Sequence, residues 1–260
     1  MVKKSLQNVW LLLVLVFLYA PIVVLAFYSF TDAAMIGTFR HFSLENYRVL
    51  FSTEELRDMI LGTLALTLAV SVISTVLGTL GAMGAFYSRK KGRRLMDLMN
   101  QIPVVNAEVV TGFSVCVLMI VLFGVDKSTY IPLVVGLTSL CTPFVYLSVM
   151  PRLKQMDPQL YEAALDLGCS PLDALRKVVL PQIVPGIVSG FMLAVTLTLD
   201  DYFIITYTKP AAFDTISTYV VNATRGAQTQ IKTALWALST LIFAVVIVAV
   251  IIMNRRKEEA

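Results

Sequence analysis

The chain has 260 residues, of which 57% are hydrophobic and only 15% are charged, and its formal net charge is +4. A soluble domain has about 25% charged residues, so this composition excludes an ordinary soluble globular protein and indicates an integral membrane protein. At this length the spans and their loops account for the whole chain, and we expect a single transmembrane domain over residues 1–260.

Six apolar segments approach or exceed the roughly 20 residues that an α-helix needs to cross a bilayer. They predict an all-α fold with six transmembrane helices, over residues 9–30, 59–87, 98–123, 131–150, 185–207 and 233–253. Lys3 and Lys4 precede the first segment, but its apolar run is too long for a signal peptide and no A-x-A cleavage site follows. We therefore expect the first helix to stay in the protein as an anchor.

Basic residues in the loops predict the orientation of these helices. Fourteen of the 21 Lys and Arg residues lie on the side that carries the N-terminus, the run "RKKGRR" and the long loop over 151–184. The remaining seven lie on the opposite side. Because short loops with an excess of Lys and Arg stay in the cytoplasm, we expect both termini to be cytoplasmic.

The loop over residues 151–184 is far longer than a connection between two spans requires. Its first part, "DPQLYEAALDLG", has the pattern of a short helix. Asp157 is suited to the N-cap, Pro158 to the first helical position, and Gly168 to the left-handed conformation that ends a helix. The sequence therefore predicts a soluble-looking helix and turn in a membrane protein.

The second part of the loop, "SPLDALRKVVL", repeats the pattern, with Ser170 as cap and Pro171 in the first turn. We expect this second helix to stop at Pro181. The two helices should leave Glu162 and an apolar ridge exposed, and such a ridge needs a protein partner. The ridge is predicted from helical spacing in the first helix: Leu160, Ala163, Ala164 and Leu167.

Residues 162–181 resemble the EAA motif of the permeases of ABC importers. Glu162-Ala163-Ala164 is followed after three intervening residues by Gly168 and, after nine more intervening residues, by "VVLP", with Val178 where the motif has isoleucine. The resemblance implies the type I ABC importer permease fold, in which this loop forms coupling helices that dock on an ATPase subunit. ATP and Mg²⁺ would bind to that partner, and we expect no cofactor on this chain. The coupling residues that the resemblance implies are Glu162, Ala163, Ala164, Gly168, Leu180 and Pro181.

The resemblance covers nearly the whole chain. The stretches "YAPIVVLAFYSF", "YRVLF" and "LTLDDYFIITY" are similar to the spermidine/putrescine permeases, and most nearly to their second, C-type subunit. This implies an importer of polyamines in the bacterial inner membrane. It also implies a homologous second permease, two ATPase subunits and an extracytoplasmic substrate-binding protein as partners. We expect the loops over 31–58 and 209–232 to be the docking surfaces for the binding protein.

Three carboxylates fall inside the predicted spans, namely Glu108, Asp200 and Asp201. An acidic residue at the centre of a membrane helix costs about 2.5–3.5 kcal/mol on the insertion scale, so these side chains should face the bundle interior or water. We expect them to line a path in which carboxylates compensate the charge of a polyamine. The aromatic faces of Tyr202 and Tyr207 would accept its methylenes and ammonium groups.

Other interpretations of these acids remain open. Adjacent helical residues point about 100° apart, so one member of the Asp200–Asp201 pair can line the path while the other bonds a neighbouring helix. The pair can also cap a broken helix or hold two permeases together. Glu108, in a segment that contains Pro103 and Gly112, can serve purely as an internal hydrogen-bond acceptor of a kinked helix.

Motifs for an enzyme are missing from the sequence. It has no P-loop or nucleophile elbow, a single histidine (His41), and three cysteines without metal-ligand spacing. Iron, thiamine, sulfate or molybdate remain as alternative cargoes, although anions fit poorly with three acids in the membrane. An ion-coupled secondary carrier could use the same acids as a relay, but it would leave the EAA-like loop unexplained.

Overall fold

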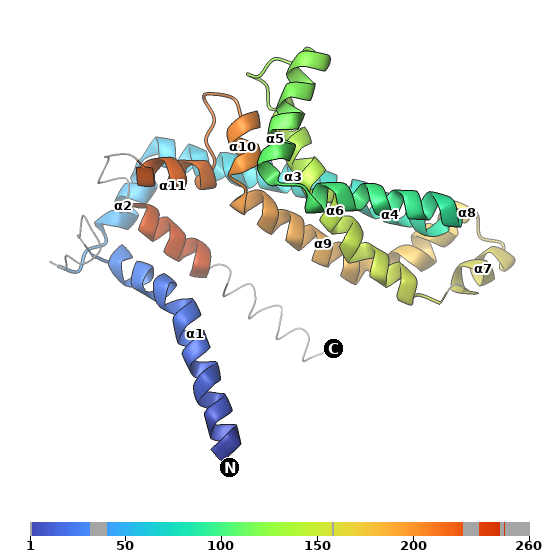
Figure 1. Ribbon diagram of the computed structural model, residues 1–260, viewed down its shortest axis with the longest axis horizontal. Helices are drawn as coiled ribbons and strands as arrows, with labels where there is room; N and C mark the ends of the chain where they lie inside the picture. Colours follow the sequence, from blue (N-terminus) through green and yellow to red (C-terminus); the bar gives the residue numbers. More distant parts are fainter. Residues whose placement is uncertain (1, 32–40, 158, 226–233, 245–246, 248–260) are drawn as a thin grey trace. The chain divides into compact units, whose positions relative to one another are not determined.

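A computed structural model describes residues 2–31, 41–157, 159–225, 234–244 and 247 of the chain (Figure 1). These residues are almost entirely helical, and their only β-type pairing is an isolated bridge between Thr31 and Phe42. The chain divides into two compact units, one over residues 59–218 and the other over residues 1–58 and 219–260. The all-α fold class predicted from the sequence is confirmed.

The unit that contains the N-terminus holds α1 (Val2–Ser29), α2 (Glu45–Ser52), the first turn of α3 (Glu54–Tyr87) and most of α11 (Ile216–Arg225). In the apolar window of Asn8–Ser29 no residue of α1 is buried by the rest of the described chain, as expected for a helix surrounded by lipid or by a partner. Asn46 of α2 closes the end of α1, since its Nδ2 donates to the carbonyl oxygens of Ser29 at 3.0 Å and Thr31 at 2.9 Å. These bonds satisfy carbonyls that a helix C-terminus leaves unpaired.

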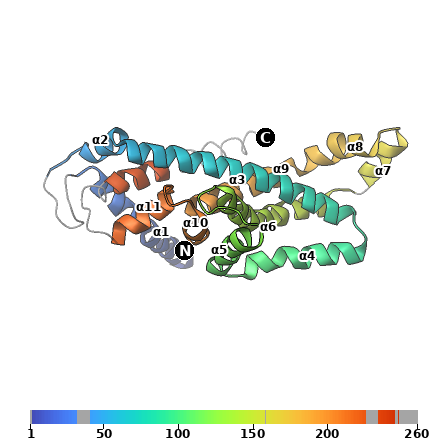
Figure 2. The same cartoon turned by 90° about the horizontal axis from the view of Figure 1, so that it is seen from above.

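The unit over residues 59–218 is built around α6 (Ile131–Gln155). In its apolar window 61% of residues are buried, against 28% for α3 and for the helical run Pro171–Asp200, so α6 is the central helix. Around it lie α4 (Lys90–Val105), α5 (Glu108–Val117), α7 (Gln159–Asp166), α8 (Pro171–Ala174), α9 (Leu180–Asp200) and α10 (Phe203–Thr208). Two π-helical turns, η1 (Leu118–Leu122) and η2 (Leu175–Val179), follow α5 and α8. Figure 2 shows α4 returning alongside the second half of α3.

Glycines set the spacing between α6 and its two main neighbours, α3 and α9. A Cβ atom at Gly78 of α3 would lie 2.7 Å from the Cβ of Val145, and one at Gly190 of α9 would lie 3.1 Å from the Val145 Cα. One turn away, a Cβ at Gly186 would lie 3.0 Å from the carbonyl oxygen of Ser148. Small residues of this kind let membrane helices approach until their backbones touch.

Four of the predicted spans correspond to helices that are long and apolar enough to cross a membrane: Asn8–Ser29, Glu54–Tyr87, Ile131–Gln155 and Pro171–Asp200. The predicted third span, over 98–123, is strongly bent. It is a pair, α4 and α5 with η1, bent by 105°. Asn106 and Ala107 have extended backbone at the break, and the Asn106 side chain donates to Thr111 Oγ1 at 3.0 Å. Of the predicted sixth span, residues 234–244 are helical, and 233, 245–246 and 248–253 lie outside the described residues.

The expected stop at Pro181 is wrong, because the chain remains helical from Pro171 to Asp200. A proline inside a helix clashes with the carbonyl four residues earlier. Here the turn η2 widens the helix, with the Leu180 N–H bonded to the carbonyl of Leu175, five residues back. The helix of the predicted fifth span, over 185–207, therefore starts before residue 185. It ends at Asp200, and the rest of the predicted span contains a short break and α10.

The close approach at Gly78 yields a test of the packing. Gly78→Ala should lower the thermal unfolding midpoint in detergent, because overpacking a tight contact costs about 1–3 kcal/mol. Gly84 is the matched control on the same helix, since a Cβ there meets nothing within 4 Å. Gly84→Ala should raise the midpoint or leave it unchanged, because alanine is the better helix former by about 0.8–1.0 kcal/mol. Equal shifts for both variants would contradict the packing described.

Candidate functional site

One candidate region is the segment over residues 159–174, which we call the Gly168 turn. Asp157 Oδ1 accepts from the Gln159 N–H at 2.9 Å, which confirms the predicted cap of α7, while Pro158 lies outside the described residues. Gly168 has φ +86°, and the N–H groups of Gly168 and Cys169 bond the carbonyls of Leu165 at 2.9 Å and Ala164 at 3.0 Å. This double closure is the Schellman ending of a helix, so the predicted role of Gly168 is confirmed.

The second helix of the Gly168 turn starts at a reciprocal cap. Ser170 Oγ accepts from the Asp173 N–H at 3.2 Å and donates to Asp173 Oδ2 at 2.7 Å, an arrangement that fixes the first turn of a helix. The Ser170 hydroxyl, and then Lys177 at 3.3 Å, lower the pKa of the exposed Asp173 carboxyl below its ordinary value. Asp173 therefore stays ionised at neutral pH and keeps the cap in place.

The Gly168 turn exposes large apolar side chains. Leu167 is 87% exposed and Leu172 is 79% exposed, and Glu162 and Ala163 are exposed beside them. The predicted ridge is wrong at Ala164, which is only 7% exposed. The small Ala164 side chain faces inward and lets α7 pack against η2.

Aromatic and aliphatic contacts hold the Gly168 turn against the bundle. The rings of Tyr161 and Tyr87, at the end of α3, have centroids 5.0 Å apart. Leu175 and Leu180 pack against the buried core, while Pro181 is exposed in the first turn of α9. The six residues of the EAA-like pattern therefore lie on or just after a turn that is anchored at one end of the run Pro171–Asp200.

The other candidate region is at the opposite end of that run, and we call Glu108, Asp200 and Asp201 the acidic junction. Asp201 is 5% exposed, and its Oδ1 accepts from the Ile205 N–H at 3.0 Å, which caps the start of α10. Its other oxygen, Oδ2, is buried and has no partner among the described residues. Asp200 is exposed, and its backbone carbonyl accepts from the Ser217 hydroxyl at 3.3 Å. The two neighbouring acids thus have different environments.

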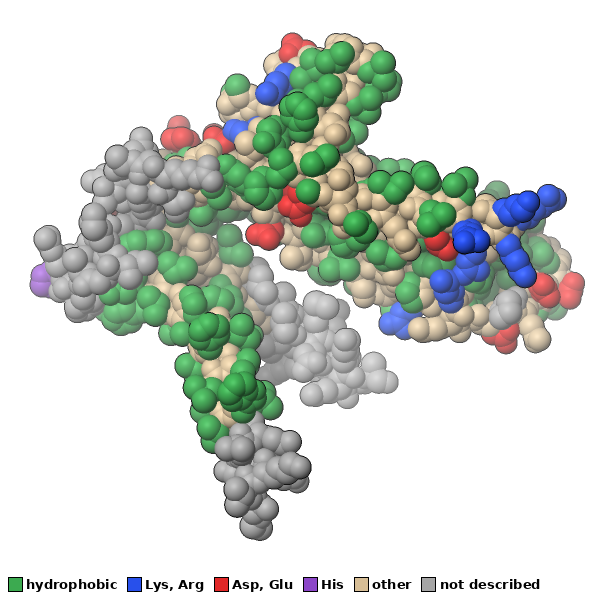
Figure 3. Space-filling view, viewed as in Figure 1, with side chains coloured by type: hydrophobic (Ala, Val, Ile, Leu, Met, Phe, Trp, Pro, Cys, Tyr) green, Lys and Arg blue, Asp and Glu red, His purple; other side chains and the backbone are tan. Residues whose placement is uncertain are grey.

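Two glycines position α10 and bring α5 to the acidic junction. Ile204 is fully buried, and a Cβ at Gly112 of α5 would lie 2.8 Å from its Cα. A Cβ at Gly136 of α6 would lie 2.8 Å from its Cγ2. Because α5 is pressed against α10, the exposed Glu108 at its first turn comes within electrostatic range of Asp201. Figure 3 shows acidic side chains where α5 and α9 meet, and basic ones gathered around the far ends of α4 and α6.

The predicted aromatic residues lie beside these acids. Tyr202 follows Asp201 directly, and its ring meets that of Phe203 edge to face at 5.4 Å. Tyr207, which is partly exposed, meets Phe113 of α5 edge to face at 6.1 Å. The structure therefore brings together Glu108, Asp200, Asp201 and Tyr202, and it places Tyr207 further along α10, against α5.

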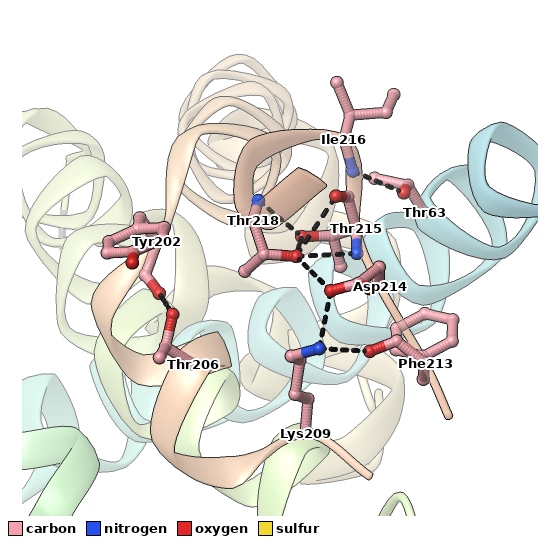
Figure 4. A network of polar contacts seen from close by, with 9 residues as sticks. All are labelled: Thr63, Tyr202, Thr206, Lys209, Phe213, Asp214, Thr215, Ile216 and Thr218. Atoms are coloured by element: carbon pink, nitrogen blue, oxygen red, sulfur yellow. Dashed lines mark hydrogen bonds and ion pairs between the residues drawn. The ribbon is translucent and has the colours of Figure 1, made fainter. Parts of the chain in front are cut away.

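A polar network that sequence reasoning missed fixes the segment after α10 (Figure 4). Lys209 Nζ donates to Asp214 Oδ1 at 2.5 Å and to the Phe213 carbonyl at 2.7 Å. Thr218 Oγ1 also donates to Asp214, and the Ile216 N–H donates to Thr63 Oγ1 of α3 at 3.1 Å. The sequence signal that could have predicted this network is a lysine followed five residues later by an aspartate. The network holds the start of α11 on α3.

Residues 74–258 match the protein family described as "Binding-protein-dependent transport system inner membrane component". The chain is 29% identical to the putrescine transport system permease protein PotI of Escherichia coli (strain K12) over 252 residues, which cover 94% of this chain and 88% of that protein. It is 25% identical to the spermidine/putrescine transport system permease protein PotC of Haemophilus influenzae over 256 residues, which cover 98% and 99% of the two chains.

The fold is similar to that of a chain in the crystal structure of a bacterial alginate ABC transporter, in complex with its periplasmic protein bound to an alginate pentasaccharide. The TM-score is 0.76 at 20% identity, and the match covers 98% of this chain and 94% of the other. The fold implied by the EAA-like motif is thus confirmed.

Proposed function

This chain belongs to the family of inner membrane components of binding-protein-dependent transport systems, and on that premise we propose that it is the permease subunit of an ATP-driven polyamine importer. It would form the translocation path with a homologous second permease. Two ATPase subunits would bind ATP and Mg²⁺, and an extracytoplasmic binding protein would deliver the cargo. The permease relatives named for putrescine and spermidine transport support this choice of cargo over iron, thiamine or sulfate.

The observation that carries the proposal is the unbroken helical run from Pro171 to Asp200. Its first residues belong to the Gly168 turn and its last residue to the acidic junction. At about 1.5 Å per residue the run spans roughly 44 Å, which is about the thickness of a bilayer with its headgroups. A displacement of the Gly168 turn by an ATPase is therefore transmitted along one helix to the acidic residues.

At the acidic junction we assign different roles to the two neighbouring aspartates. Asp200 and Glu108 are exposed and lack a basic partner within ion-pair distance among the described residues, so they compensate the charge of a polyamine in transit. Tyr202 and Tyr207 supply aromatic faces to its methylene and ammonium groups. Asp201 is buried and capped on α10, so it holds the helix break that leaves Asp200 at the end of α9.

The Gly168 turn has the features of a docking element for an ATPase subunit. Leu167 and Leu172 are exposed apolar side chains next to the exposed Glu162. We place this turn and both termini in the cytoplasm, in line with the excess of Lys and Arg on that side. The loops over 31–58 and 209–232 are then on the outer side, available to the binding protein, with residues 32–40 and 226–232 outside the described residues.

Variants of the acidic junction test the path. In the reconstituted complex, Asp200→Asn and Glu108→Gln should each slow uptake of labelled spermidine by about tenfold or more, equivalent to about 1.4 kcal/mol. Thermal stability and basal ATP hydrolysis should be unchanged. Asp201→Asn keeps an acceptor for the Ile205 N–H and should be mild. Asp201→Ala should instead lose about 0.5–2 kcal/mol of stability with the cap. Wild-type uptake by both Asp200→Asn and Glu108→Gln would refute the path.

The coupling role predicts a second phenotype. Glu162→Lys reverses an exposed charge, and Gly168→Pro forbids the positive φ of the turn. Both should reduce transport and the stimulation of ATP hydrolysis by the binding protein, without removing the protein from the membrane. Lys127→Glu is the control, because this exposed charge lies in the loop before α6, at the end remote from the Gly168 turn. Normal transport with both loop variants would rule out the coupling role.

Cys169, beside Gly168, reports the orientation of the membrane helices. A membrane-impermeant maleimide should not label it from outside intact cells, and should label it in inverted vesicles that lack the ATPase. Cys169→Ser provides the background from Cys116, while Cys141 is buried. Labelling from outside, absent in Cys169→Ser, would reverse the proposed orientation.

A further inference from the structure

Residues 200–217 form a loop that returns to its own starting point, and we call it the return loop. Ser217 lies 17 residues after Asp200, and its hydroxyl donates to the Asp200 carbonyl oxygen at 3.3 Å. Asp200 is the last residue of α9, and the last carbonyls of a helix have no partner within it. The Ser217 hydroxyl therefore supplies a partner to Asp200 and holds the backbone where α9 ends.

Lys209 cross-links the two arms of the return loop (Figure 4). It follows α10 directly, and its ammonium group donates to the Asp214 carboxylate at 2.5 Å and to the Phe213 carbonyl oxygen at 2.7 Å on the returning arm. The Lys209 side chain is only 16% exposed, and an ion pair shielded from water is stronger than one on the surface. The returning arm is thus tied to the end of α10.

The Asp214 carboxylate also organises the turn that follows it. Thr218 Oγ1 donates to Asp214 Oδ1 at 3.1 Å and accepts from the Thr215 N–H at 3.0 Å. Both threonines are buried, so the turn belongs to the interior of the fold. Ser217 lies in this turn, next to Thr218, and its position therefore follows from that of Asp214.

Contacts to two longer helices fix the returning arm to the bundle. The Ile216 N–H donates to Thr63 Oγ1 of α3 at 3.1 Å. The Phe213 ring is in close contact with α3, since a Cβ atom at Gly62 would lie 2.9 Å from its Cε2. It also meets the ring of Tyr130, at the start of α6, edge to face at 5.2 Å. The returning arm is therefore held by α3 and α6 as well as by α10.

We propose that Lys209 is a positioning residue for the Asp200 carboxylate. Acting through Asp214 and Ser217, it fixes the backbone at the end of α9 and so sets the direction in which this exposed acid meets a polyamine. The proposal rests on the proposed function of Asp200 in the path. Asp201 fixes the same point from the other side by capping α10. Such support matters because a functional group displaced by about 1 Å can lose much of its effect.

The position of residue 200 can be measured without transport. Asp200→Cys, combined with Cys116→Ser and Cys169→Ser, leaves the buried Cys141 as the only other thiol. The measurement is the rate at which a water-soluble maleimide labels this chain in the purified complex. Adding Lys209→Met, which removes the ion pair but keeps an unbranched apolar side chain, should change the rate by about threefold or more, as the loss of one hydrogen bond does.

A second variant and two matched controls complete the labelling experiment. Ser217→Ala removes the contact with the α9 carbonyl and should also change the rate. Lys127→Met removes an exposed lysine charge, and Ser189→Ala removes a hydroxyl that donates within its own helix to Pro185 at 2.9 Å. Both controls lie outside the return loop and should label as the parent chain does. An unchanged rate with Lys209→Met, or with Ser217→Ala, would overturn the proposal.

Uptake shows whether this position matters for transport. Lys209→Met and Ser217→Ala should each slow uptake of labelled spermidine by the reconstituted complex by about fivefold. In an Asp200→Asn chain neither should have a further effect, because the carboxylate that they position is absent. An equal fractional loss in both backgrounds would indicate general damage to the fold and overturn the proposal. So would wild-type uptake by Lys209→Met when Asp200→Asn is slow.

The two measurements also separate this proposal from the proposed function. Wild-type uptake by Asp200→Asn alone would refute the role of this acid in the path. The labelling rates of the Asp200→Cys chains would then decide by themselves whether Lys209 positions residue 200.

Discussion

The close contact of three helices around Val145 is the constraint on which the rest of the structure depends. Lipid offers no hydrophobic force between membrane helices, so their association relies on direct van der Waals contact. Gly78, Gly186 and Gly190 remove the side chains that would separate α3 and α9 from α6. Because α9 is fixed against α6 at Gly186 and Gly190, the Gly168 turn and the acidic junction are held at the two ends of the helical run Pro171–Asp200.

The short helix α10 introduces a break, with polar groups, into this rigid frame. α10 has six residues and is fixed by Ile204 between two glycines and by the cap from Asp201. Interrupting the span in this way leaves polar backbone groups at membrane depth, which is tolerated only when protein or water satisfies them. Asp201 satisfies one of these groups, and Asp200 is thereby left exposed. Asp201 thus has a structural role as a cap, and the charge-bearing role that we propose falls to Asp200.

The sequence predicts the features that depend on local chemistry. The caps at Asp157 and Ser170 and the positive φ of Gly168 are confirmed because each involves residues a few positions apart. A kinked helix around Glu108 was considered, but neither the size of the bend at Asn106–Ala107 nor the helical passage through Pro181 was predicted. In both cases the outcome depends on geometry that hydropathy does not record, namely a break between two apolar stretches and a widened turn that accommodates a proline ring. The contacts of Ile204 with Gly112 and Gly136 join segments far apart in the chain, so no local pattern reveals them.

The exposure of Leu167 and Leu172 has a consequence for the life of the subunit before assembly. Covering a leucine side chain is worth about 1.5–3 kcal/mol, so two uncovered leucines on a loop that we propose to lie in the cytoplasm favour association with other proteins. Quality-control proteases and chaperones act on exposed apolar surface. The two side chains that would receive an ATPase would therefore also expose an unassembled chain to these proteases, and we expect permease made in excess of its partners to be degraded.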